Sequence, residues 1–271
     1  MNDFLIHGGT RAAFEVLVAD AVQFDVPSVL TLGQALDRLE AEKATAGWDI
    51  DADEMTPWAS VNRRVGRWRR GNLVVLSGPQ GTGKTTWALN VVASWAARGS
   101  PALMYCLEMG VEELVQHVLC AHYQLLEDQI TPDVIGKARR ELGRWPLYFG
   151  SNPRMTGRKD LIALLGHAVR RHGLALVAFD NLHMLARSIE HRVEEVSVLT
   201  KEFKCFAMEH EIPLILIAQP RKLEPGRVMT PWDLKDSVDI FSDADQVILL
   251  HRELIGASQD TKAIAAASAE G

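Results

Sequence analysis

The sequence predicts an α/β domain in which a mostly parallel central sheet is flanked by helices. From Gly71 onward, short apolar runs of strand length alternate with longer amphipathic stretches. Alternation of this kind builds a parallel sheet covered on both faces. We expect buried strands at Leu73–Leu76, Ala102–Leu107, Leu174–Phe179, Pro213–Ala218 and Gln246–Leu250, and helices that include Thr86–Ala97 and Val193–His210.

A further helix is predicted ahead of this domain. Thr31 and Gln34 have the spacing of a capping box, in which each residue bonds to the other's backbone N–H. Apolar residues then recur at helical spacing over Thr31–Lys43, namely Leu32, Ala35, Leu36 and Leu39. We therefore divide the chain into a leader with a linker helix over residues 1–57, a core over residues 58–253 and a short tail over residues 254–271.

Composition excludes several classes of protein. The 271 residues are 47% hydrophobic, enough for one substantial core. A net charge of −6 argues against coating duplex DNA with the outer surface, although a local basic patch stays open. Three scattered cysteines indicate a reducing compartment, and the chain lacks the roughly 20 consecutive apolar residues of a membrane span. We expect a soluble cytoplasmic protein with no membrane partner, encoded by a bacterium or phage, and leave a mitochondrial location open.

One motif predicts a nucleotide site. The segment Gly78–Thr85 matches G-x-x-x-x-G-K-[ST], with an apolar strand before it and a helix after it. Its glycines let backbone N–H groups turn toward phosphates, Lys84 would reach the β- and γ-phosphates, and Thr85 would bind Mg²⁺. A glycine-rich turn that matches by chance is the alternative. We expect ATP and Mg²⁺ to bind, with nucleotide contacts from Gly78, Gly81, Thr82, Gly83, Lys84, Thr85 and Thr86.

Three expected strands end in side chains suited to hydrolysis. Asp180 follows LALVAF and could support Mg²⁺, so Thr85 and Asp180 form the expected metal site. Glu108 follows ALMYCL, where it could polarise an attacking water, and Gln219 follows PLILIA, where it could donate to the γ-phosphate. Each alone could be an ordinary polar residue at a strand end. Because ligands bind beyond the carboxyl ends of parallel strands, we expect the three to gather beside the phosphate loop.

From Trp58 to Arg252 these residues resemble the RecA-like P-loop NTPase core of replicative helicases. The segment CLEMGVEEL at Cys106–Leu114 and the segment Asp233–Glu253 resemble blocks of the DnaB family. FDNLHML at Phe179–Leu185 and AQPRKLE at Ala218–Glu224 are similar to Twinkle and the phage primase-helicases. The resemblance implies an ATP-dependent replicative DNA helicase that moves along single-stranded DNA as a homo-oligomeric ring, a hexamer in this family.

The same resemblance implies roles for individual residues. It makes Glu108 the catalytic base and Gln219 the γ-phosphate sensor, and it places Arg252 where the phage enzymes stack an arginine on the nucleotide base. Pore-facing loops would lie near Ala186–Glu194 and Arg221–Trp232. The expected contacts to single-stranded DNA are Arg221, Lys222 and Arg227.

Neighbouring subunits and further domains are also implied. Asn2–Ala21 resembles the end of a toprim-type primase region, so a primase region is an expected partner or ancestor. The linker helix would dock on the adjacent subunit, with packing within its own subunit as the alternative. In this family the adjacent subunit also supplies an arginine finger. That finger segment is not recognisable after Arg252, so we expect intact nucleotide binding, weak hydrolysis and a shortened chain.

Two other functions stay open from the sequence. One is a RecA- or KaiC-like ATPase in recombination or signalling, and the other is a non-catalytic ATP-binding assembly module. The arginine-rich run Asn62–Arg70 is expected to be a solvated turn, with contact to DNA or a neighbouring subunit as the alternative. His117, Cys120 and His122 lack the paired spacings of zinc sites, so we expect no metal there.

Overall fold

The computed structural model describes residues 10–13, 30–44, 55–151, 158–186, 192–220, 229–230, 233, 240 and 242–252. Contacts divide the chain into two compact units, Met1–Asp49 and Ile50–Gly271. Each unit is considered by itself below. Among the described residues, no helix has the length and apolar character needed to cross a bilayer.

The N-terminal unit contains the predicted helix, α3, at Leu32–Ala44. The capping box is present, because Thr31 N donates to Gln34 Oε1 at 2.9 Å and Gln34 N donates to Thr31 Oγ1 at 3.3 Å. These two bonds satisfy backbone N–H groups that the first turn of a helix leaves without partners. The prediction of a helix at this position is therefore confirmed.

The larger unit is built on a six-stranded sheet in which every pairing is parallel. The strands lie in the order β3-β2-β4-β5-β1-β6. Strands β1, β2, β4 and β5 are buried at every residue and apolar except for Ser77 and Asp180 at the ends of β1 and β4, as expected for a sheet covered on both faces. The bounds are β1 Leu73–Ser77, β2 Ala102–Cys106, β3 Leu147–Gly150, β4 Leu176–Asp180, β5 Leu214–Ala218 and β6 Gln246–Leu249.

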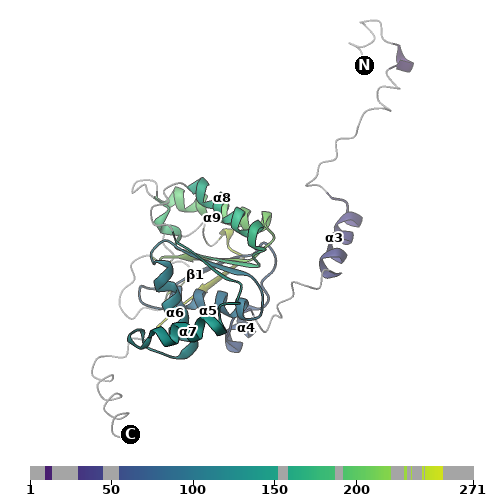
Figure 1. The fold of residues 1–271 in the computed structure, drawn as a ribbon. Coiled ribbons are helices and arrows are strands. Elements are labelled where there is room, and N and C mark those ends of the chain that lie inside the picture. Colours follow the sequence, from purple (N-terminus) through teal and green to yellow (C-terminus); the bar gives the residue numbers. More distant parts are fainter. Residues whose placement is uncertain are drawn as a thin grey trace. The chain divides into compact units, whose positions relative to one another are not determined.

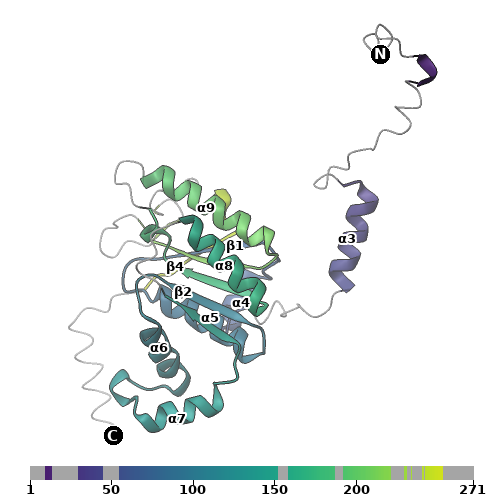
Figure 2. The same ribbon diagram turned by 45° about the horizontal axis from the view of Figure 1, so that its top comes forward.

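Helices cover both faces of this sheet. Figures 1 and 2 show α8 and α9 on one face and α4, α5, α6 and α7 on the other. The predicted α/β class with a parallel sheet is confirmed. The bounds are α4 Ala59–Val65, α5 Lys84–Ala97, α6 Val111–Tyr123, α7 Pro132–Glu141, α8 Arg158–His172 and α9 Arg192–Glu209, with short 3₁₀ turns η2 Glu127–Gln129 and η3 Leu182–Met184.

The structure corrects two details of the sequence analysis. Strand β4 begins at Leu176 rather than Leu174, because the backbone N–H of Leu174 bonds back to Val169 and closes the end of α8. The run Asn62–Arg70 is not simply a solvated turn. Asn62 is buried in α4, where its side chain binds Thr56, and Trp68 is buried against Trp95.

Strand β3 was not foreseen at all. It pairs with β2 at one edge of the sheet and is only half-buried. The strand has only four residues, with Pro146 directly before them. An apolar run this short does not distinguish a strand from a loop.

Candidate active site

The phosphate loop connects the buried strand β1 to helix α5 and depends on three glycines. Gly81 and Gly83 have φ values of 78° and 86°, a region that side chains rarely adopt. A Cβ on Gly78 would lie 2.6 Å from the carbonyl oxygen of Leu250, just beyond β6. The loop therefore needs glycine for two reasons, backbone conformation and close approach to a neighbouring strand.

The first turn of α5 presents backbone N–H groups and Lys84 to the loop. Helix α5 begins at Lys84, and its N-terminal N–H groups form the kind of site that attracts phosphate. Lys84 Nζ donates to the carbonyl oxygens of Gly78 and Pro79 at 2.8 and 3.0 Å. Burial lowers the pKa of Lys84, while the carboxylates of Asp180 and Glu108 favour its charged form. A phosphate placed within the loop would meet this ammonium at close range.

Thr85, in the first turn of α5, contacts Asp180, the last residue of β4. Thr85 Oγ1 donates to Asp180 Oδ2 at 2.5 Å, and Asp180 is only 2% exposed. Burial raises the pKa of Asp180, and the Thr85 hydroxyl offsets part of this shift. A hydroxyl and a carboxylate side by side are the hard oxygen donors that Mg²⁺ prefers, so the pair fits the predicted metal site.

Glu108 lies at the next strand end and accepts two amide hydrogen bonds. Asn181 Nδ2 and Gln219 Nε2 both donate to Glu108 Oε1, the latter at 3.3 Å. The register of the strands explains why these three side chains meet. Cys106 of β2 lies opposite Asp180 of β4, and β5 runs alongside β4. Glu108 is exposed, so water can reach its carboxylate.

Three further residues belong to this cluster and were not singled out as site residues. Asn181 contacts Glu108, and His183 Nδ1 accepts a hydrogen bond from Gln219 N at 3.1 Å. Cys106 Sγ lies 3.8 Å from Asp180 Oδ2, and burial with this carboxylate nearby raises the pKa of the thiol to about 12. Its thiol is therefore neutral and no nucleophile. The polar residues Asn181 and His183, close after the end of β4, were an available signal, whereas Cys106 lies within the apolar run of β2 and had none.

The structure describes Thr82, Thr86 and Arg252, the remaining predicted contacts to the nucleotide. Thr82 Oγ1 closes the loop by donating to Pro79 O at 2.8 Å, and Thr86 is exposed on α5. Arg252 is exposed two residues beyond Leu250, whose N–H donates to Ser77 O at 2.7 Å beside the phosphate loop. The predicted DNA contacts lie outside the described residues, as does most of the leader stretch: Arg221, Lys222, Arg227 and residues 2–9 and 14–21.

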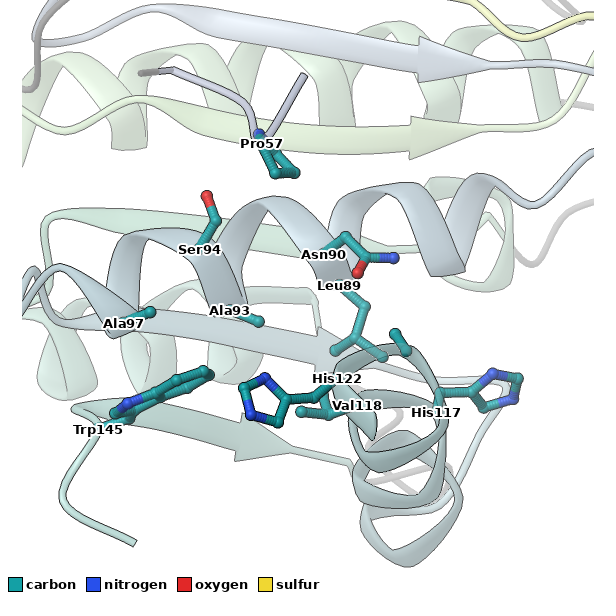
Figure 3. A pocket seen from close by; sticks show the side chains of 11 residues that line it. Pro57, Leu89, Asn90, Ala93, Ser94, Ala97, His117, Val118, His122 and Trp145 are labelled. Atoms are coloured by element: carbon teal, nitrogen blue, oxygen red, sulfur yellow. The ribbon is translucent and has the colours of Figure 1, made fainter. Parts of the chain in front are cut away.

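A hollow of about 250 Å³ lies between α5 and α6, and none of the predicted site residues lines it. Figure 3 shows the side chains of His117 and His122 on opposite sides of α6. His122 packs edge-on against Trp145, with ring centroids 5.4 Å apart. The hollow is lined from the middle and end of α5, whereas the phosphate loop precedes the start of that helix.

The family model and the individual relatives found by comparison with known proteins agree with one another. The sequence model of the family described as "DnaB-like helicase C terminal domain" matches residues 55–270. The replicative DNA helicase DnaB of Geobacillus stearothermophilus is 28% identical over 213 residues, 73% of this chain and 47% of that protein. The DnaB of Leifsonia xyli is 26% identical over 92% of this chain and 57% of that protein. The chain thus spans about half the length of these relatives.

Solved structures share the fold. One of them, described as an ATPase domain, superposes with a TM-score of 0.65 at 19% identity, covering 82% of this chain and 84% of that one. A DnaB-like replicative helicase, described with its interactions with primase, gives a TM-score of 0.66 at 19% identity over 89% of this chain and 61% of that one. At this level of identity the likeness concerns the fold alone.

Proposed function

Because the chain belongs to the family of DnaB-like helicase C-terminal domains, we propose that it binds ATP with Mg²⁺ and hydrolyses it to drive movement along single-stranded DNA. One observation carries the proposal. The hydrogen bond between Thr85 and Asp180 joins the phosphate loop to the end of β4, directly beside Glu108 and Gln219. Metal ligands, base and sensor thus share one edge of the sheet.

In the proposed reaction the chain positions triphosphate, metal and water. The loop N–H groups and Lys84 would hold the β- and γ-phosphates. Thr85 with Asp180 would hold Mg²⁺, which when bound would neutralise phosphate charge. Glu108 takes a proton from water as the water oxygen bonds to the γ-phosphorus. The bond from that phosphorus to the β–γ bridging oxygen breaks, which releases ADP and inorganic phosphate.

Gln219 and Arg252 have roles at the two ends of the nucleotide. Gln219 turns its amide from Glu108 to a γ-phosphate oxygen and so reports whether ATP is present. Arg252 stacks on the base, which its place just beyond the Leu250–Gly78 contact supports. Both roles use side chains that are accessible on the open sheet edge.

The proposed partners are single-stranded DNA and further copies of the chain. Arg221, Lys222 and Arg227 would meet DNA phosphates in a loop that follows β5 and Gln219. The proposed catalytic base, Glu108, is exposed. An accessible site of this kind suits completion by a neighbouring subunit, as in a hexameric ring. The named relatives are bacterial, which favours a cytoplasmic location. One related structure is described with primase interactions, so a primase region is a proposed partner.

A RecA- or KaiC-like function is the weaker candidate. A KaiC-like protein of Pyrococcus horikoshii superposes with a TM-score of 0.50 at 19% identity, which concerns the fold alone. The family match over residues 55–270 favours the helicase instead.

The base assignment predicts a large effect from one substitution. Glu108→Gln preserves size and hydrogen bonding but cannot accept the proton from water. We expect turnover of ATP, measured by release of labelled phosphate, to fall by about 10²–10⁴-fold. Binding of ATP should persist, because the phosphate loop is unchanged.

Glu112→Gln is the matched control. Glu112 is exposed in the first turn of α6, shortly after Glu108 in the sequence. The Glu112→Gln variant should hydrolyse ATP at the wild-type rate. Normal hydrolysis by Glu108→Gln would show that Glu108 is not the base.

A further inference from the structure

Asn181 connects the candidate base to the turn that follows β4. Its amide nitrogen donates to Glu108 Oε1, and its side-chain oxygen accepts a hydrogen bond from Met184 N at 3.1 Å, which caps η3. Asn181 is only 2% exposed. Both ends of the amide are therefore bonded inside the protein, and the side chain has one fixed orientation.

Gln219 offers the same carboxylate oxygen a different kind of contact. Its bond to Glu108 Oε1 is long, at 3.3 Å, and its side chain is more accessible than that of Asn181. When Gln219 turns to a γ-phosphate, this longer bond is the one that is given up. Asn181 cannot follow, because its oxygen remains on Met184 N.

We propose that Asn181 is the positioning residue that holds Glu108 toward the attacking water while ATP is bound. The inference rests on the proposed function, in which Glu108 is the base and Gln219 the sensor. An amide donor fixed on Oε1 leaves Oε2 to accept the proton. It also removes rotamer freedom from an exposed side chain that would otherwise spend much of its time in solvent.

Two substitutions separate this role from the capping of η3. Asn181→Ser keeps an oxygen that can accept from Met184 N but has no amide that reaches Glu108, whereas Asn181→Ala loses both contacts. If Asn181 acts by donating to Glu108, both variants lower kcat for ATP by about 10- to 100-fold and leave KM unchanged. If it only caps the turn, Ser behaves as the wild type and Ala alone is impaired.

The experiment measures kcat and KM for ATP in the full chain, with melting temperatures alongside. Asn72→Ser is the matched control, because Asn72 Oδ1 also accepts a backbone N–H, from Arg69 at 2.6 Å, but before β1 at the opposite end of the sheet. It should keep the wild-type kcat, and Asn181→Ser should keep the wild-type melting temperature.

Parallel assays of Glu108→Gln identify which claim fails. A wild-type kcat in Asn181→Ser, together with an impaired Glu108→Gln, overturns the positioning role and leaves the base in place. A wild-type kcat in Glu108→Gln overturns both claims. A loss of kcat in both Asn181 variants at constant KM supports the inference.

Discussion

At the scale of single residues, the buried carboxylate of Asp180 lowers the stability of the fold, and its proposed role in holding Mg²⁺ would explain why it is there. Its carboxylate is almost completely buried, and burial raises its pKa above the ordinary value. The folded protein therefore binds a proton at the Asp180 carboxylate more tightly than the unfolded chain does. The associated stability is present at low pH and is lost as pH rises through the folded-state pKa, so the ionised carboxylate destabilises the nucleotide-free protein at neutral pH.

Asp180→Asn should consequently stabilise the nucleotide-free protein. An amide keeps the size and an acceptor for the Thr85 hydroxyl without placing a charge in the interior. We expect a higher melting temperature than the wild type at neutral pH, and a difference that shrinks as pH falls toward the ordinary pKa of a carboxyl group, about 4. Melting curves across this pH range are the measurement.

The same variant should lose the stabilisation that Mg²⁺ with ATP gives the wild type. A melting temperature at neutral pH below that of the wild type would contradict the account of Asp180. Asp133→Asn, at an exposed position in the first turn of α7, is the control for removing one negative charge.

Not every residue of the site could be predicted from the sequence. Lys84 and Thr85 follow from a local motif, because their roles depend on a single loop and helix. The Asn181–Glu108 contact joins residues 73 positions apart and exists because β2 and β4 are neighbours. Strand–helix alternation predicts a parallel sheet but does not give the order of its strands.

At the scale of elements, β6 depends on side-chain contacts at its start. Asp245 Oδ2 accepts from Leu73 N at 2.6 Å and pairs with Lys204 of α9 at 2.6 Å. Trp68 Nε1 donates to Gln246 Oε1 at 2.8 Å. These contacts hold a strand that is followed directly by Leu250, the residue that lies against Gly78 of the phosphate loop.

Lys204→Met should loosen this edge while keeping the apolar part of the side chain. The lysine also donates to Gly71 O at 2.9 Å, so two hydrogen bonds are lost. Because the ammonium and carboxylate are partly exposed, we expect the free energy of unfolding to fall by only about 1 kcal/mol. Chemical denaturation is the measurement.

Lys201→Met is the matched control on the same helix. Lys201 is exposed, and its side chain makes no hydrogen bond or ion pair with the part of the chain that the structure describes. Its stability should equal that of the wild type. Equal stability of Lys204→Met and Lys201→Met would argue against the fastening of β6.

Elements differ in how clearly the sequence specifies them. Helix α7 was not singled out, although Thr131 caps it and Pro132 begins it, which are recognised start signals. Strand β3 has no comparable signal, because four half-buried residues carry little periodicity. The buried strands were predictable since they are continuous apolar runs.

At the scale of the whole molecule, parallel pairing brings all the candidate groups to one edge. The phosphate loop follows β1, Glu108 and Gln219 follow β2 and β5, and Asp180 is the last residue of β4. These four strands are adjacent in the sheet. At this edge Glu108 and Arg252 are exposed. A neighbouring copy could therefore contribute to the same nucleotide, which is the arrangement that we propose for the ring.

The central claim is that Gly78–Thr85 binds the triphosphate of ATP, and isothermal titration of ATP with Mg²⁺ tests it most directly. Lys84→Ala should weaken binding by about 10- to 100-fold, because a charge-assisted hydrogen bond to phosphate contributes about 1.5–3 kcal/mol. Lys201→Ala, at an exposed lysine on α9, should bind as the wild type does. Wild-type affinity in Lys84→Ala would contradict the account.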